Sequence, residues 1–148
     1  MDVNNLVNFS AVAISGQTGN DTITGSQVVD IITQNANAGS DTIDGQGGTG
    51  DLLSVSADQD QTLTDTTLTI GGATSTFADM EQIRLVGGAG NNIIDASSVS
   101  SSGPFATVSI SGLAGRTVVL VEQVVIALSL LGFRERDRFS AAQQDVTF

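Results

Sequence analysis

Aspartates at regular intervals near the start of the chain are the residues most able to do chemistry. Asp21, Asp30 and Asp41 each begin an Asp-x-Ile sequence, and Asp51 follows ten residues later. Glycines precede each aspartate, and glycine turns can direct backbone carbonyls inward because glycine readily adopts positive φ. Carboxylate and carbonyl oxygens are hard ligands, which suit calcium better than softer transition metals. The spacing therefore points to calcium binding at oxygen-rich turns.

The composition excludes several other chemistries. The 148 residues contain no His, Cys, Lys, Trp or Tyr, which excludes zinc fingers, Ser–His or cysteine nucleophile systems, haem ligation through imidazole and disulfides. Sixteen acidic residues against five arginines give a formal net charge of −11. This charge argues against nucleic acid as a partner, because phosphate binding requires clustered basic residues. We also expect no membrane span and no N-terminal signal peptide, because no apolar segment of the required length or flanking charge is present.

The elements that position the aspartates are expected to be short strands joined by glycine turns. Val, Ile and Thr are abundant, and the chain has 17 glycines against one proline. The sequences NDTIT, VDIIT and SDTID surround Asp21, Asp30 and Asp41 at spacings of nine and eleven residues. GGAGNNIID (87–95) repeats the pattern with Asn92 at the aspartate position. These segments resemble the nonapeptide Gly-Gly-x-Gly-x-Asp-x-(large apolar)-x of the RTX, or hemolysin-type, calcium-binding repeat family.

The resemblance covers about residues 15–53 and 77–115, and it implies an all-β fold, a short parallel β-roll or β-solenoid. In such a fold two nonapeptides make one coil, so that Asp21 and Asp41 should stack on one edge and Asp30 and Asp51 on the other. Calcium would be held between the stacked turns. The expected metal ligands are Asp21, Asp30, Asp41, Asp51, Gly16, Gly19, Gly39, Gly48 and Asn92. Because several motif positions are degenerate, we expect one or two calcium sites rather than a full ladder.

Charge divides the chain at Gly115. Residues 1–115 contain twelve acids (eleven Asp and Glu81) and one base, Arg84, whereas residues 116–148 contain four acids and four arginines. We therefore predict a β-roll domain over 1–115 and an atypical non-repeat tail over 116–148.

A strand-rich insert without the repeat is expected at about residues 54–76. Its sequence QTLTDTTLTIGGATSTF predicts two or three short strands, with turns at Asp65 and at Gly71-Gly72.

The tail has two interpretations. Leu120–Phe133 can be encoded so that the reading frame two nucleotides later spells Gly-Gly-Ala-Gly-Ser-Asp-Arg-Phe-Ile-Phe-Thr-Gly-Ile, which is another copy of the repeat. This favours the loss of one nucleotide between about Gly115 and Leu120, which would put the tail out of frame. The other interpretation is a genuine C-terminal cap.

The function expected from the resemblance is that of a calcium-binding structural module, not an enzyme, in a secreted or cell-surface protein. Its expected partners are calcium ions, other domains of a parent protein, and extracellular matrix or glycan. One alternative is an adhesion module without tight calcium sites. A second is a polysaccharide lyase or hydrolase that uses Asp79, Glu81 and Arg84. Residues 77–85 alternate like one strand, which would place the two acids and Ile83 on one face and Met80 and Arg84 on the other.

Overall fold

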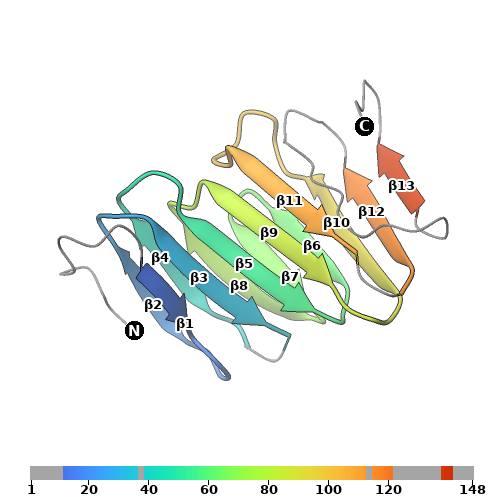
Figure 1. Ribbon diagram of the computed structural model, residues 1–148, viewed down its shortest axis with the longest axis horizontal. Coiled ribbons are helices and arrows are strands. Elements are labelled where there is room, and N and C mark those ends of the chain that lie inside the picture. Colours follow the sequence, from blue (N-terminus) through green and yellow to red (C-terminus); the bar gives the residue numbers. More distant parts are fainter. Residues whose placement is uncertain (1–11, 37–38, 113–114, 122–137, 142–148) are drawn as a thin grey trace.

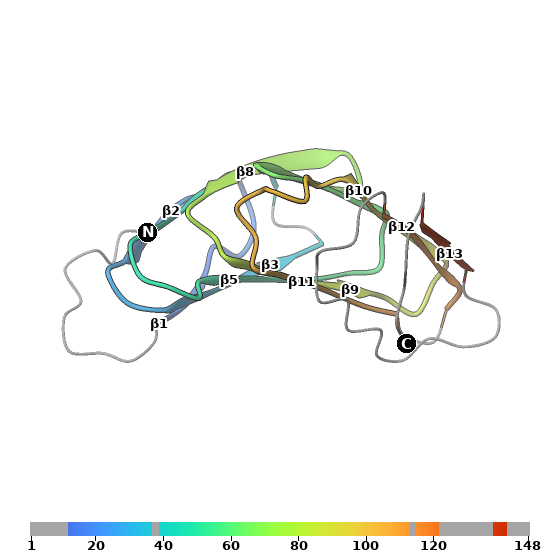
Figure 2. The same ribbon diagram turned by 90° about the horizontal axis from the view of Figure 1, so that it is seen from above.

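The computed structural model describes residues 12–36, 39–112, 115–121 and 138–141. These residues form thirteen β-strands and no helix, which confirms the predicted all-β class. Accordingly, nothing in these ranges is a helix that could cross a membrane. The strands lie in two sheets that face each other as two layers (Figure 2).

The first sheet has five strands, and every neighbouring pair in it is parallel. Its strands in spatial order are β1 (Val12–Ser15), β3 (Asp30–Asn35), β5 (Leu52–Ala57), β9 (Gln82–Gly87) and β11 (Thr107–Ser111). Buried and exposed side chains alternate along these strands, so that one face of the sheet packs on the core.

The second sheet has eight strands. Its strands in spatial order are β13 (Arg138–Ala141), β12 (Thr117–Val121), β10 (Asn92–Ser98), β6 (Gln61–Thr64), β7 (Thr67–Ile70), β8 (Ala73–Ala78), β4 (Thr42–Gln46) and β2 (Thr22–Ser26). All pairs are parallel except β6–β7 and β7–β8. β12 continues the sheet across the boundary predicted at Gly115, whereas 122–137 and 142–148 of the predicted tail lie outside the described residues.

Apart from β6–β8, successive strands from β1 to β12 alternate between the two sheets (Figure 1). We call one passage through both sheets a circuit. Residues one circuit apart lie side by side, as Thr22 pairs with Thr42 and Ile31 with Leu52. The turns between the sheets therefore stack along two opposite edges of the molecule.

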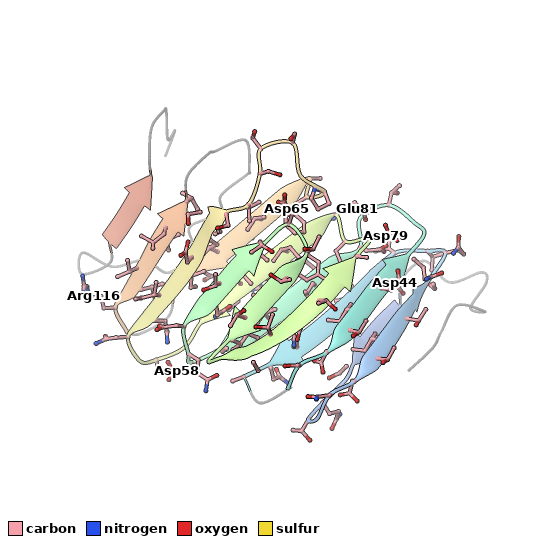
Figure 3. The ribbon with its side chains drawn as sticks, turned by 180° about the vertical axis from the view of Figure 1, so that it is seen from behind. Asp44, Asp58, Asp65, Asp79, Glu81 and Arg116 are labelled. Carbon is pink, nitrogen blue, oxygen red and sulfur yellow. The ribbon has the colours of Figure 1, made fainter. Side chains whose placement is uncertain are left out.

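We name the two edges by their first aspartate. The Asp21 edge contains the turns at 16–21, 39–41, 58–60, 88–91 and 115–116. The Asp30 edge contains the turns at 27–29, 47–51, 79–81 and 99–106. Figure 3 shows Asp79 and Glu81 on the Asp30 edge and Asp58 on the opposite side of the molecule.

The insert predicted at about 54–76 begins within β5, and the rest of it forms β6, β7 and most of β8. The turn between β6 and β7 contains Asp65, and the turn between β7 and β8 is Gly71-Gly72, where both glycines have positive φ (+55° and +97°). The insert widens only the eight-stranded sheet, because β5 and β9 on either side of it remain direct neighbours. Leu63 and Leu68 from the insert are fully buried, which makes it part of the common core.

Residues 77–85 do not form the single strand that their alternation predicts. β8 ends at Ala78 and β9 begins at Gln82, and the residues between them form a turn in which Asp79 has a φ of +53°. Met80 is therefore buried while Arg84 is exposed, so the prediction that these two share a face is wrong. Apolar and polar residues continue to alternate in the sequence through this turn, so the alternation gives no sign that the strand ends at Ala78.

Candidate metal centre

On the Asp21 edge, two neighbouring turns clamp each other through reciprocal hydrogen bonds. The backbone N–H of Asp21 donates to Oδ1 of Asp41 at 2.9 Å, and the backbone N–H of Ser40 donates to Oδ1 of Asn20 at 2.9 Å. Each turn thus supplies one side-chain acceptor and one backbone donor to the other. The predicted stacking of Asp21 on Asp41 is confirmed, while the binding of a metal there stays a prediction.

Glycine is required at three positions of these two turns. A Cβ on Gly16 would lie 3.0 Å from Oδ2 of Asp21, so the turn wraps closely around its own carboxylate. Gly19 and Gly39 have φ values of +109° and +99°, which L side chains rarely adopt. A Cβ on Gly39 would also collide with the carbonyl oxygen of Gly19 in the stacked turn. These glycines allow close stacking of the turns.

The Asp41 carboxylate is buried, with 3% of its residue surface exposed, and both of its oxygens accept hydrogen bonds. Oδ2 accepts from Nε2 of Gln34 at 2.9 Å. The Oγ of Ser75 accepts from the Asp41 N–H at 3.0 Å and from Gln34 Nε2 at 2.6 Å. By contrast, Oδ2 of Asp21 is buried and has no hydrogen-bond donor in the described part of the chain.

On the Asp30 edge, three acidic side chains form a ladder. The Asp30 N–H donates to Oδ1 of Asp51 at 2.7 Å, so this predicted pair is also confirmed as neighbours. The N–H groups of Gly50 and Asp51 both donate to Oε2 of Glu81 at 2.9 Å. Here, too, the carboxylates of Asp51 and Glu81 accept backbone N–H groups of the adjacent circuit.

The carboxylate of Asp30 is already engaged by a serine from its own turn. The Ser26 N–H donates to Oδ2 at 2.7 Å, and the Ser26 hydroxyl lies 3.0 Å from Oδ1 and 3.2 Å from Oδ2. Gly48, one of the expected ligands, has a φ of +127° and stacks over Val28, whose carbonyl oxygen would lie 3.0 Å from a Cβ. In this turn, the N–H and hydroxyl groups of Ser26 already occupy the Asp30 oxygens that the repeat motif would offer to a calcium ion.

Burial and neighbouring acids together raise the pKa of Asp51. Its pKa is raised from 3.8 to about 6, chiefly by burial, and the charges of Glu81, Asp30 and Asp79 add to the increase. The hydrogen bond from the Asp30 N–H acts in the opposite direction because it favours the ionised form.

Asn92, the last expected ligand, takes part in a network with Asp58. Its Oδ1 accepts from the Gly88 N–H at 2.9 Å, and its Nδ2 donates to Oδ1 of Asp58 at 3.1 Å. Asp58 also accepts from the Gly90 N–H at 2.8 Å. Sequence reasoning did not find Asp58, Gln34 or Ser75 as parts of these edges, because these three residues themselves lie outside the repeat motif.

The proposed enzyme cluster is not assembled as one site. Glu81 uses Oε2 to hold the turn at Gly50 and Asp51. Arg84 is exposed on the outer face of β9, and Asp79 lies in the turn before that strand. Within the described residues, this arrangement does not bring the base to the two acids.

Two carboxylates, an amide and backbone carbonyls are the oxygen donors at the Asp21 edge, and this donor set suits calcium. The buried Oδ2 of Asp21, which lacks a donor, is the observation that fits an ion there. In the described ranges, no three or more His, Cys, Asp or Glu side chains gather as a metal-holding group, so the amide and backbone oxygens would have to complete the shell. Comparison of the chain with protein-family models, with curated proteins and with solved structures finds no match.

Proposed function

We propose that the protein is a calcium-stabilised structural module, built as a short parallel β-roll of hemolysin-type repeats. Three features support this proposal. Parallel strands alternate between two sheets, the circuits from β1 to β5 are 18 to 21 residues long, and the repeat aspartates stack at the turns. The observation that carries the calcium assignment is the buried Oδ2 atom of Asp21, which has no donor among the described residues and lies beside the buried residue Asp41.

Calcium would act by coupling ion binding to folding. Residues 1–115 hold twelve acids and one base, so charge repulsion opposes the compact state. A divalent cation held by Asp21 and Asp41 would offset this repulsion where the first two turns of the Asp21 edge stack. An ion that binds the folded chain better than the unfolded chain stabilises it in proportion to its concentration.

We propose that this module belongs to a secreted or cell-surface protein, and the resemblance to the repeat family supports this. Calcium is abundant outside cells, and extracellular modules bind it with dissociation constants of about 10⁻⁴–10⁻³ M. Neighbouring domains of a parent protein, or extracellular matrix or glycan, are the proposed macromolecular partners. In this role the module supplies a rigid spacer rather than a catalytic surface.

The test is thermal unfolding of the full chain, followed by circular dichroism in millimolar CaCl₂, in MgCl₂ and in EDTA at equal ionic strength. We expect calcium to raise the midpoint and magnesium to have little effect, because magnesium requires a smaller octahedral site. Asp21→Asn should reduce the increase caused by calcium. Identical curves in CaCl₂ and EDTA for the wild type would contradict the proposal.

Asp44→Asn is the matched control, since it removes the same charge from a nearby strand. Asp44 is only half-buried, and its two oxygens accept from the backbone N–H and Nε2 of Gln46 at 2.9 and 2.7 Å. Its hydrogen-bond partner Gln46 is the last residue of β4, at the end of the strand that leads to the Asp30 edge. This variant should keep the full calcium-dependent increase in midpoint.

A further inference from the structure

A buried glutamine interrupts an otherwise apolar row of the five-stranded sheet. Gln34 on β3 pairs with Val55, which pairs with Leu85, which in turn pairs with Ile110. All four side chains face the core, and Gln34 is only 4% exposed. A buried amide is costly unless both its donor and acceptor groups are satisfied, so its presence in this row requires a polar partner.

In the described part of the chain, partners are seen for only one end of the Gln34 amide. Nε2 donates to Oδ2 of Asp41 at 2.9 Å and to Oγ of Ser75 at 2.6 Å. Oε1 is buried and accepts no hydrogen bond from the described residues. A buried acceptor without a donor is destabilising, and the two bonds made by Nε2 do not remove that cost.

A second donorless oxygen belongs to the same small network. Asp41 is hydrogen-bonded to both Gln34 and Asp21, through its Oδ2 and its Oδ1 respectively. Oδ2 of Asp21 is the other buried oxygen of this network that has no donor. Asp41 is thus hydrogen-bonded to two residues, Asp21 and Gln34, that each carry a buried oxygen without a donor among the described residues, and a cation bound beside Asp41 would give these oxygens a partner.

We propose that Gln34 supplies an oxygen ligand, through Oε1, to the calcium ion held by Asp21 and Asp41. This inference rests on the proposed function, and it adds a ligand that lies outside the repeat motif and on the opposite sheet. Amide carbonyl oxygens are ordinary calcium ligands, and the two carboxylates balance the charge of a divalent ion. The role also explains why Gln34 replaces the aliphatic side chain found at its neighbours.

The test is calorimetric titration of the full chain with CaCl₂, together with thermal unfolding in EDTA. Gln34→Leu should weaken calcium binding by at least about tenfold, the loss typical of removing a group that supports a bound metal. Gln34→Glu keeps the size of the side chain and adds a charged oxygen. It should lower the midpoint in EDTA and raise the calcium affinity, and it remains informative where Gln34→Leu fails to fold.

Gln61→Leu is the matched control. Gln61 is fully buried and its Oε1 also has no donor, but its Nε2 donates to the carbonyl oxygens of Ala57 and Val86 rather than to a carboxylate. Replacing it should lower the midpoint in EDTA and leave the calcium affinity unchanged. This control separates the loss of a buried glutamine from the loss of a calcium ligand.

The outcomes distinguish the two proposals. If the wild type binds calcium and both Gln34 variants bind it with unchanged affinity, Gln34 is only a hydrogen-bond donor to Asp41 and this inference is overturned, while the proposed function stands. If Gln61→Leu weakens binding as much as Gln34→Leu, the inference is also overturned. If the wild type binds no calcium, the proposed function fails, and this inference fails with it.

Discussion

At the scale of single residues, the repeat aspartates combine two separable properties, which are hydrogen-bond acceptance and negative charge. Their oxygens accept backbone N–H groups from an adjacent circuit, as in the pairs Asp21–Asp41 and Asp30–Asp51. A neutral amide can do the same, since Asn20 and Asn91 accept the N–H groups of Ser40 and Arg116. The clamp therefore does not require a charge, and the charge of the buried aspartates is the feature that favours a cation as their further partner.

The raised pKa of Asp51 gives a prediction for stability against pH. An acid whose folded pKa exceeds its unfolded value contributes stability that is fully present below about pH 3.8 and is lost as the pH rises through about 6. Asp51→Asn removes the charge and keeps an acceptor for the Asp30 N–H. In EDTA, the gain in free energy of unfolding over the wild type should therefore grow from pH 4 to pH 7, by up to about 2 kcal/mol.

Urea unfolding of both proteins at the two pH values measures this difference. Asp60→Asn is the control, because Asp60 is exposed and its side chain accepts the Ile93 N–H at 2.8 Å. Its effect should be nearly the same at both pH values. If the difference in free energy of unfolding between Asp51→Asn and the wild type is the same at pH 4 and pH 7, the assignment of the titration to Asp51 is refuted.

At the scale of turns and strands, two glycines with the same backbone conformation should respond differently to substitution. Gly39 and Gly72 have φ values of +99° and +97°. A Cβ on Gly72 would meet nothing within 4 Å, whereas a Cβ on Gly39 would collide with the carbonyl of Gly19. Gly72→Ala should cost about 1–2 kcal/mol for conformation alone. Gly39→Ala should cost about 1–3 kcal/mol more, because the stacked turns must separate.

Chemical unfolding of the two variants in EDTA measures both costs. The calcium-dependent increase in the thermal midpoint should fall in Gly39→Ala and stay unchanged in Gly72→Ala, since only the first alters the Asp21 edge. Equal losses of stability in the two variants would show that the turns at Gly19 and Gly39 do not stack closely in solution.

The sequence predicts the elements that follow its own periodicity. The phase of Asp-x-Ile, together with the coil of two nonapeptides that the resemblance implies, was enough to place Asp21 beside Asp41 and Asp30 beside Asp51. The three strands of the insert were also predictable from their turn residues.

Contacts that cross between non-equivalent segments could not be predicted in this way. Ser75 meets Gln34 over a separation of 41 residues, and Asp58 meets Asn92 over 34. These separations depend on how the insert folds back, and nothing in the local pattern encodes them. The same limit explains the wrong strand at 77–85, where the break at Asp79 comes from a turn that alternation does not reveal.

At the scale of the whole molecule, the excess of acids over bases predicts a response to salt. Without calcium, raising NaCl from about 10 mM to about 500 mM should increase the thermal midpoint, because the Debye length falls from about 30 Å to below 10 Å and screens the repulsion. CaCl₂ at the same ionic strength should increase the thermal midpoint further, because an ion bound at the turns stabilises the folded chain in addition to screening its charges. A midpoint that falls with NaCl would show that repulsion does not limit stability.

The reciprocal clamp between the turns at Asn20–Asp21 and Ser40–Asp41 fixes how the protein could be shortened. Each turn completes the hydrogen bonding of the adjacent turn, and Thr22 and Thr42 occupy equivalent places in neighbouring strands. Deleting residues 22–41 would join Asp21 directly to Thr42 and leave the remaining register intact, whereas removing half as many residues would attach strands to the wrong sheet. One circuit is thus the unit by which the protein can be lengthened or shortened, and variants of different length can be engineered by adding or removing a whole circuit.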